Sequence, residues 1–214
     1  MNLIMLPYKN KQKIEICIDE AGRGCMAGPV YASAVVWSHT VDSTGIKDSK
    51  KLSKKKRKAK EQFIRENSIA YGIGSSSAEE IDKHNILEAT YIAMHRAVDE
   101  VIKKLNLTEK DYDRTVLLVD GKWFKPYWTE YGWMEHECII KGDDTYIGIA
   151  AASILAKVNH DKHIKSICLQ FPDDVAVYKW EKNMCYGTAE HINAIRENGI
   201  SQFHRKTFGI CANY

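Results

Sequence analysis

Long apolar runs are absent from this sequence, since no stretch approaches the roughly 20 residues that a membrane-spanning helix needs. The segment from Met1 to Gln12 is too polar for a secretory signal. There is no G-x-x-x-x-G-K-[ST] loop to hold a nucleotide's phosphates, and no repeat or low-complexity linker. We therefore expect a soluble, cytoplasmic protein with no membrane partner.

The cysteines lack the spacing of a metal site. The six cysteines form no C-x-x-C pair and have no neighbouring histidine at zinc spacing, which argues against structural zinc. Scattered cysteines of this kind are typical of free thiols in a reducing compartment. They occupy positions 17, 25, 138, 168, 185 and 211.

The overall composition is that of an ordinary globular protein. Of the 214 residues, 44% are hydrophobic and 28% are charged, which excludes a disordered, collagenous or disulfide-dense class without choosing a function. The length suits one well-buried core with an appended element, but is short for two typical domains. We expect a catalytic core over residues 1–165 and a helical C-terminal extension over residues 166–214, packed together as one functional unit.

Positive charge is concentrated in one segment. The net charge of +3 hides nine basic residues and one acid between Lys47 and Lys60, so the rest of the chain is net negative. Such a block is either a solvated helix face or flexible arm, or a patch that contacts phosphates. Clustered Lys and Arg supply the salt-sensitive part of nucleic-acid binding. The sequence alone leaves both interpretations open.

Alternation and helical spacing predict an α/β fold. Ile14, Ile16 and Ile18 share one face of an alternating segment, which is typical of a strand. The expected strands cover residues 13–18, 30–37, 70–76, 115–119 and 136–140, with the first three forming an antiparallel meander. The expected helices cover residues 53–66, 77–105, 146–165 and 188–197, and Ser53 is well placed to cap the first.

Acidic residues follow three of these strands, as Asp19-Glu20, Asp120 and Asp143-Asp144. If the strands are parallel neighbours, the carboxylates converge, because functional groups of α/β folds gather at the carboxyl ends of strands. Each acid also has another interpretation when taken alone. Asp120-Gly121 suits a turn, Asp143 or Asp144 a helix N-cap, and Asp19-Glu20 a solvated strand end.

Taken together, the acids predict a site for divalent cations. Several carboxylates with ordinary pKa values near 4 would repel one another unless cations neutralised them. Hard oxygen ligands without Cys or His favour Mg²⁺ or Mn²⁺ over zinc. Two such ions roughly 3.5 to 4 Å apart would suit phosphodiester hydrolysis, although a phosphotransferase stays open at this point.

Six ordered segments of the chain resemble the ribonuclease HII family. The opening segment is Asp19-Glu20-Ala21-Gly22-Arg23-Gly24, with Gly28-Pro29-Val30 after it. The other five are Asp48-Ser49-Lys50-Lys51-Leu52-Ser53; Glu80-Ile81-Asp82 with Asn85-Ile86 and Ala89-Thr90; Val119-Asp120-Gly121; Lys141-Gly142-Asp143; and Ala151-Ala152-Ser153-Ile154-Leu155-Ala156-Lys157-Val158. The match runs from about residue 14 to residue 208, and the arginine in the first turn favours this family over ribonuclease HIII.

The resemblance implies a ribonuclease-H-like fold, with a mixed five-stranded sheet flanked by helices and a helical C-terminal extension. It also implies an endonuclease that uses Mg²⁺ or Mn²⁺ in two-metal-ion hydrolysis. Such an enzyme cuts the RNA strand of RNA/DNA hybrids and ribonucleotides embedded in duplex DNA, leaving 3′-hydroxyl and 5′-phosphate ends. The implied roles are DNA replication and ribonucleotide excision repair.

The family's catalytic, metal-binding acids map onto Asp19, Glu20, Asp120 and Asp143. Asp144 is the weaker candidate of its pair, because the family's carboxylate directly follows Lys-Gly, and Asp143 holds that place here.

Substrate contacts also follow from the resemblance. A protein tells RNA from DNA by contacting the 2′-hydroxyl, and the family assigns this task to the Gly22-Arg23-Gly24 turn and Tyr186. Their structural alternatives are a permissive glycine turn and a packed aromatic ring. Phosphate contacts are expected at Lys50, Lys51, Arg205, Lys206 and Thr207.

The chain departs from the family just before Tyr186. A basic His-Lys-Gly-Tyr pattern is usual there, whereas this chain has Asn183-Met184-Cys185-Tyr186. The lost glycine and positive charge would alter junction preference or weaken binding.

Two other functions stay open, a catalytically inactive nucleic-acid-binding module and a ribonuclease-H-like DNA nuclease. The basic block supports the first, but four retained acids do not. We expect a monomer that acts on RNA/DNA hybrids and on DNA containing ribonucleotides. A sliding-clamp partner has no support, because Ile210 to Tyr214 shows no clear clamp-binding pattern.

Overall fold

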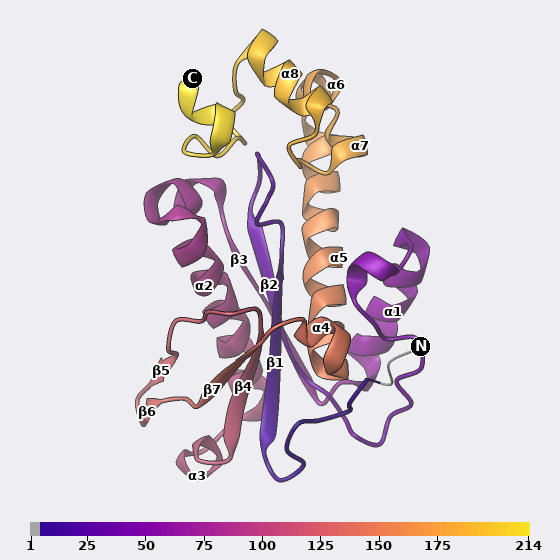
Figure 1. Cartoon of the computed structure of the whole chain (residues 1–214), viewed down its shortest axis with the longest axis vertical. Helices are drawn as coiled ribbons and strands as arrows, with labels where there is room; N and C mark the ends of the chain where they lie inside the picture. The colour runs from indigo at the N-terminus through magenta and orange to yellow at the C-terminus, as the bar shows by residue number, and fades with distance from the viewer. Residues whose placement is uncertain (1–4) are drawn as a thin grey trace.

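The computed structural model describes residues 5–214, and its centre is one mixed five-stranded sheet (Figure 1). The strand order is β3-β2-β1-β4-β7, which confirms the predicted sheet. The strands are β1 (Ile14–Ala21), β2 (Val30–Val36), β3 (Ala70–Ser76), β4 (Thr115–Asp120) and β7 (His136–Ile139).

Strand direction explains why acids from distant segments meet. The predicted meander is present, because β1, β2 and β3 pair antiparallel in sequence order. On its other side β1 pairs parallel with β4, and β4 pairs parallel with β7. The strands β1, β4 and β7 therefore end at the same edge of the sheet, where loops leave for functional sites.

Helices cover both faces of the sheet (Figure 1). The helix α2 (Ala78–Leu105) packs on one face and forms a core with Ile16, Ile18 and Leu117. The helix α5 (Ile147–Gln170) covers the other face, with α1 (Lys54–Asn67) beside it. The long helices lie where the sequence predicts them, and Ser53 caps α1 by accepting a hydrogen bond from the Lys56 N–H at 3.4 Å.

Several short elements were not predicted, because one turn of helix or two residues of strand leave no readable periodicity. The segment 123–133 contains a small hairpin. These elements are η1 (Ser49–Lys51), α3 (Glu109–Tyr112), β5 (Trp128–Thr129), β6 (Gly132–Trp133), α4 (Gly142–Thr145) and η2 (Gly209–Asn213).

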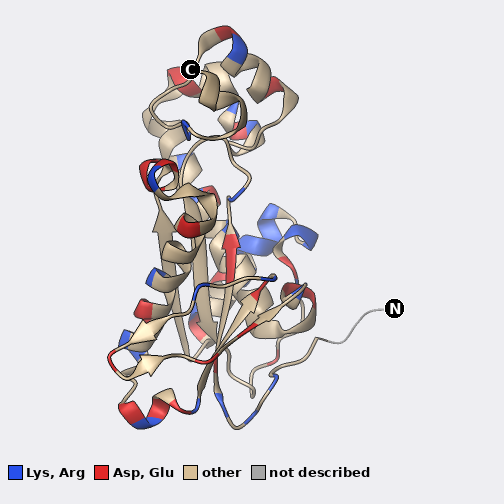
Figure 2. Cartoon of the chain, turned by 60° about the vertical axis from the view of Figure 1, so that its left-hand side comes forward, with Lys and Arg blue, Asp and Glu red and all other residues tan. Residues whose placement is uncertain are grey.

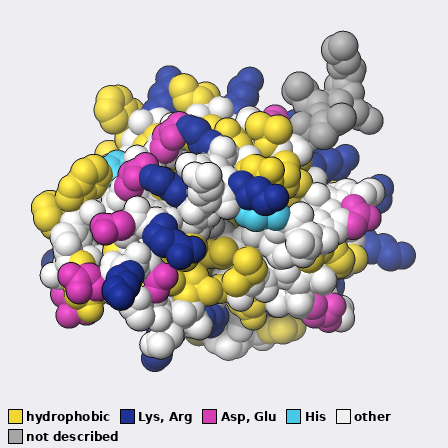
Figure 3. All heavy atoms as spheres, turned by 90° about the horizontal axis from the view of Figure 1, so that it is seen from below, with side chains coloured by type: hydrophobic (Ala, Val, Ile, Leu, Met, Phe, Trp, Pro, Cys, Tyr) yellow, Lys and Arg dark blue, Asp and Glu magenta, His cyan; other side chains and the backbone are white. Residues whose placement is uncertain are grey.

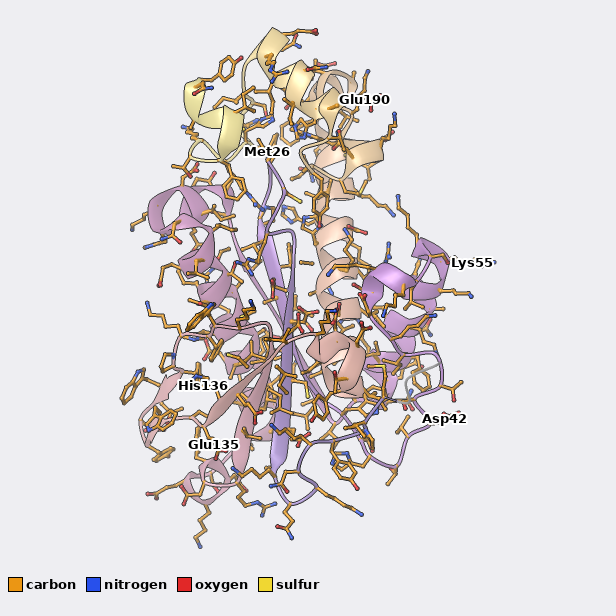
Figure 4. All side chains as sticks on the ribbon, viewed as in Figure 1. Met26, Asp42, Lys55, Glu135, His136 and Glu190 are labelled. Atoms are coloured by element: carbon orange, nitrogen blue, oxygen red, sulfur yellow. The ribbon has the colours of Figure 1, made fainter. Side chains whose placement is uncertain are left out.

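The C-terminal helices α6 (Pro172–Tyr178), α7 (Trp180–Asn183) and α8 (Ala189–Asn198) pack over the tip of the β1–β2 connection. Figure 4 places Met26 at this tip, below α8. Trp180 is fully buried in the same cluster. Because α5 continues unbroken through residue 165, the expected division at residues 165 and 166 falls inside a helix.

The cysteine side chains, the length of the apolar helices and the surface charge bear on the expectations from composition. All six cysteines lie in the described region and form no disulfide, as predicted. No helix between residues 5 and 214 is long and apolar enough to cross a membrane. Seen from below (Figure 3), acidic and basic side chains are mixed. Two ion pairs join lysines near the N-terminus to glutamates of the 135–137 segment, Lys9 with Glu137 and Lys13 with Glu135.

Candidate active site

Three predicted acids meet at the shared edge of β1, β4 and β7. Asp19 lies near the end of β1, Asp120 is the last residue of β4, and Asp143 lies in α4 directly after β7. One carboxylate oxygen from each lies within 4.8 Å of the others. Asp19 is only 5% exposed and Asp143 only 7%. Acids more than a hundred residues apart in the chain therefore form one cluster.

Backbone hydrogen bonds fix this cluster. The Asp120 carboxylate accepts hydrogen bonds from the N–H groups of Gly142 at 2.7 Å and Asp143 at 3.4 Å. A Cβ atom at Gly142 would lie 2.6 Å from Ile149 Cδ1 and 3.4 Å from the Asp120 carboxylate, so a side chain here would require Ile149 to move. The turn into α4 thus joins the ends of β4 and β7.

Burial and mutual repulsion favour the protonated forms of these acids. Burial, then Glu20 and Asp120, raise the pKa of Asp19 well above its usual value. Burial, and next Asp120, raise the pKa of Asp143 to about 6. A cation would relieve both effects. The oxygen-only donor set fits a hard divalent ion, such as Mg²⁺ or Mn²⁺.

Lys50 is the cation that the chain itself places beside the cluster. Burial lowers the pKa of Lys50, but the surrounding carboxylates, with Asp48 the strongest, raise it overall. The buried Asp48 carboxylate accepts a hydrogen bond from the Lys50 N–H at 2.8 Å and fixes η1. The strand-end pattern missed Asp48 because no strand precedes it, although it opens one of the matching family segments.

Two other acids lie at the margin. The Glu20 carboxylate is outside the group of three and pairs with Arg23 at 3.2 Å. Burial raises the Glu20 pKa, and Arg23 opposes the rise. Asp144 forms an ion pair with Lys51. Asp143 therefore belongs to the group of three, whereas Asp144 does not. The Lys51 ammonium, expected to contact phosphate, is paired with the Asp144 carboxylate of the same chain.

A hollow of about 200 Å³ opens next to the acids. Its lining includes Gly22, Gly24, Lys50, Lys157 and Tyr186. At Gly22 φ is +91°, and a Cβ atom there would lie 2.5 Å from the His160 ring, so this position requires glycine. The Lys157 ammonium lies 5.1 Å from the centre of the Tyr186 ring. The predicted recognition turn and tyrosine therefore share one concave surface with Lys50.

The structure gives Arg205 a different role from the expected phosphate contact. Its side chain is fully buried, and its guanidinium donates hydrogen bonds to three backbone carbonyls. These belong to Gly22 at 2.8 Å, Arg23 at 2.9 Å and Gly28 at 2.9 Å. Arg205 is therefore a positioning residue that holds the glycine turn. The sequence did not indicate this burial, because Arg205 stands in a polar, basic segment. Its neighbours Lys206 and Thr207 are indeed exposed.

Lys206 and Thr207 lie on the surface beside α2. Their backbone N–H groups each donate a hydrogen bond of 2.9 Å to the Asp82 carboxylate, and the Thr207 hydroxyl adds a third at 2.8 Å. Asp82 anchors this segment to the start of α2, a contact that the sequence did not reveal. The exposed Lys206 side chain is free to meet solvent or substrate.

The segment before Tyr186 shows what its unusual sequence changes. Met184 has φ +50° and Cys185 has φ +64°, both in the left-handed region that favours glycine. The glycine that the family usually has before the tyrosine would adopt this conformation without strain. Cys185 adopts it in a fully packed environment, because its side chain is only 1% exposed. Two residues other than glycine thus adopt left-handed backbone conformations directly before Tyr186.

We expect the metal-free protein to lose stability as pH rises from about 4 to about 6. In this range the Asp143 carboxyl, with its folded pKa of about 6, binds more protons in the folded chain than in the unfolded one, where its pKa is near 4. The free energy of unfolding therefore falls as pH rises through this window. At neutral pH, Asp143→Asn should raise it by about 1 to 3 kcal/mol. Urea unfolding in EDTA at several pH values measures this; identical pH profiles for the two proteins would contradict it.

Known proteins are similar to this chain over almost all of its length. The family model described as ribonuclease HII matches residues 16–211. The ribonuclease HII of Parabacteroides distasonis is 42% identical over 205 residues, covering 96% of this chain and 94% of the relative. The ribonuclease HII of Bacteroides fragilis is 42% identical over 207 residues, covering 97% and 94%.

Solved structures share the fold at low sequence identity. The ribonuclease H2 from Pyrococcus horikoshii OT3 has a TM-score of 0.70 at 20% identity, covering 93% of this chain and 95% of that chain. Bst-RNase HIII in complex with Mn²⁺ has a TM-score of 0.69 at 16% identity, covering 94% and 70%. The PCNA:RNase HII complex from Archaeoglobus fulgidus has a TM-score of 0.67 at 24% identity, and the match covers 92% of this chain and 95% of that chain.

Proposed function

The chain belongs to the ribonuclease HII family and is a ribonuclease H endonuclease, and we propose that it cuts beside ribonucleotides embedded in duplex DNA as well as within RNA/DNA hybrids. One observation carries this proposal: a cluster of carboxylates lies next to a hollow lined by the glycine turn and Tyr186. The carboxylate cluster of Asp19, Asp120 and Asp143 supplies a hydrolytic site. The hollow beside it is lined by the glycine turn and Tyr186, which can contact the sugar of a nucleotide.

We propose that the three clustered carboxylates hold Mg²⁺ or Mn²⁺, with Glu20 as a fourth ligand at the margin. Bound divalent ions, and a pair of them in particular, lower the pKa of water and stabilise negative charge that develops on a phosphate. The chain's own part is to keep the carboxylates in place. The Gly142 N–H fixes Asp120, and Lys50 adds a positive charge toward the scissile phosphate.

Recognition of the ribose rests on the glycine turn. Arg205 occupies the carbonyl oxygens of Gly22 and Arg23. The N–H groups of Arg23 and Gly24 form no hydrogen bond within the described residues, so they are available as donors. A 2′-hydroxyl can accept such a bond, whereas deoxyribose has no group to do so. This difference would let the turn select a ribonucleotide.

The ring of Tyr186 supplies the apolar surface against the sugar in this proposal. Tyr186→Ala should lower the cleavage rate at an isolated ribonucleotide more than within a continuous hybrid, where neighbouring riboses compensate. Tyr186→Phe keeps the ring and should lose no more than about tenfold, since one hydrogen bond contributes roughly 0.5 to 1.5 kcal/mol. Kinetics on both substrates measure these ratios. A Tyr186→Ala enzyme with an unchanged ratio would make the tyrosine purely structural.

A matched pair of duplexes tests the proposed function. One contains a single ribonucleotide and the other has the same sequence in DNA alone. With Mg²⁺ we expect cleavage of the first only. Equal cleavage of both would favour a ribonuclease-H-like DNA nuclease, and binding without cleavage would favour an inactive nucleic-acid-binding module.

A sliding-clamp partner is not part of the proposed function. One structural neighbour is a complex of a ribonuclease HII with PCNA, but the C-terminal segment of this chain has no clear clamp-binding pattern. A monomer that works in the cytoplasm, in replication and ribonucleotide excision repair, is the proposal that the family relationship supports.

A further inference from the structure

A second concave surface lies between α1 and α5. This groove has a volume of about 270 Å³ and is lined by side chains from both helices. Its cations are Lys54, Arg57 and Lys58 from α1, and Lys162 and Lys165 from α5. The two lysines of α5 were not part of the basic segment seen in the sequence. We refer to these five cations and the space between them as the basic groove.

Much of the positive charge in the basic groove has no protein counterion. Its one acid, Asp161, pairs with Lys157 at 2.8 Å, and Lys162 pairs with Glu61 at 2.7 Å. Between residues 5 and 214 no ion pair involves Lys54, Lys58 or Lys165. Lys9 and Lys13, by contrast, form ion pairs with Glu137 and Glu135.

The N-terminus of α1 adds to the positive charge of the basic groove. Its first turn contains no acid, although helix N-termini stabilise negative charge and normally favour it. Figure 2 shows the start of this helix in blue, and in Figure 4 Lys55 extends from it away from the body of the protein. The Arg57 guanidinium donates hydrogen bonds of 2.7 Å to the carbonyls of Ser49 and Leu52, which ties the helix start to η1.

The basic groove is connected to the active-site hollow along two elements. Lys157 lines the hollow, and Lys165 lines the groove on the same helix. These eight residues span about 12 Å at 1.5 Å per residue. Lys50 of η1 lines the hollow, and Lys54 at the start of α1 lines the groove. A nucleic-acid strand following this direction would bring a phosphate roughly three to four nucleotides from the hollow, at 3.4 Å of axis per phosphate.

We propose that the basic groove binds backbone phosphate of the duplex about three to four nucleotides from the ribonucleotide. The proposal rests on the function proposed above. The groove lining contains no aromatic side chain and only one apolar residue, Val158. It therefore offers charge without a surface for base stacking, and its contribution to binding is independent of sequence. The groove sets affinity for long duplexes and leaves the chemical step to the acids.

Salt dependence tests whether these lysines neutralise phosphate. The variant Lys58→Gln/Lys165→Gln removes one unpaired charge from each helix, and Lys103→Gln/Lys110→Gln is the control with the same charge loss on exposed lysines elsewhere. Binding to a long duplex with one ribonucleotide is measured in EDTA. The groove variant should bind about threefold to tenfold more weakly, with a salt slope reduced by about 0.9 per lost contact. Equal effects in the two variants would overturn the proposal.

Single uncharged phosphates locate the contact. Methylphosphonates are placed one at a time along both strands of the duplex. For the wild-type protein, affinity should fall at one or two positions near the expected distance. The groove variant should show no further fall at those positions, and a fall of the same size there would overturn the proposal.

Cleavage of a short duplex separates this proposal from the proposed function. A duplex truncated before the basic groove should be cut by the groove variant at the wild-type rate. Lost cleavage, together with unchanged unfolding, would mean that these lysines act in the chemical step, which would also overturn the proposal. If the wild-type protein itself failed to cut this duplex but bound long ones through the groove, only the proposed function would fail.

Discussion

Asp143→Asn should lower turnover by about a hundredfold or more, because it removes one of the three charges that would hold the catalytic cations. Metal ions contribute several kcal/mol to such reactions, and each 1.36 kcal/mol is worth tenfold in rate. The same loss is expected for Asp19→Asn and Asp120→Asn. Single-turnover cleavage of a hybrid in saturating Mg²⁺ measures it, with unfolding curves to show that the fold is intact.

The neighbouring Asp144→Asn variant is the matched control. The Asp144 carboxylate pairs with Lys51 and lies outside the group of three. An exposed ion pair contributes little to stability, so this variant should stay within about threefold of the wild-type rate. Comparable losses of turnover in the Asp143 and Asp144 variants would contradict the assignment of Asp143, and not Asp144, as the metal-binding acid.

The second large effect is expected at Arg205. Arg205→Ala should lower the free energy of unfolding by about 3 to 5 kcal/mol, because it leaves three carbonyls without their donor and opens a cavity. Cleavage should fall as well, since the Gly22-Arg23-Gly24 turn loses its support. Urea unfolding and cleavage kinetics measure the two effects separately.

Lys206→Ala is the control for Arg205, because its side chain is exposed. Its stability should stay within about 0.5 kcal/mol of the wild type. An Arg205→Ala protein with wild-type stability and weaker substrate binding would restore the direct phosphate contact that the sequence suggested.

Much of the fold could be predicted because its elements are long and periodic. The strand over residues 70–76 matches its predicted bounds, and α1 and α2 begin within one residue of theirs. Three acids could be found because strand ends with carboxylates are visible in the sequence. The resemblance supplied Tyr186, which the structure places beside the glycine turn.

What could not be predicted depends on contacts between distant segments. The burial of Arg205 follows from its hydrogen bonds to residues about 180 positions earlier, which no local pattern records. Asp48 belongs to no strand, and its role follows from η1 packing near the acids. The basic groove joins two helices, and the sequence revealed only the lysines of one.

The chemical ends of the cleavage product show whether the carboxylate cluster carries out metal-dependent hydrolysis. A duplex with one ribonucleotide is cut in Mg²⁺ and in EDTA, and the new termini are identified by mass. We expect a metal-dependent cut that leaves a 3′-hydroxyl and a 5′-phosphate, as is typical of attack by water at a cation-bound site. A 2′,3′-cyclic phosphate with a 5′-hydroxyl, formed equally well in EDTA, would show attack by the ribose hydroxyl instead and would contradict it.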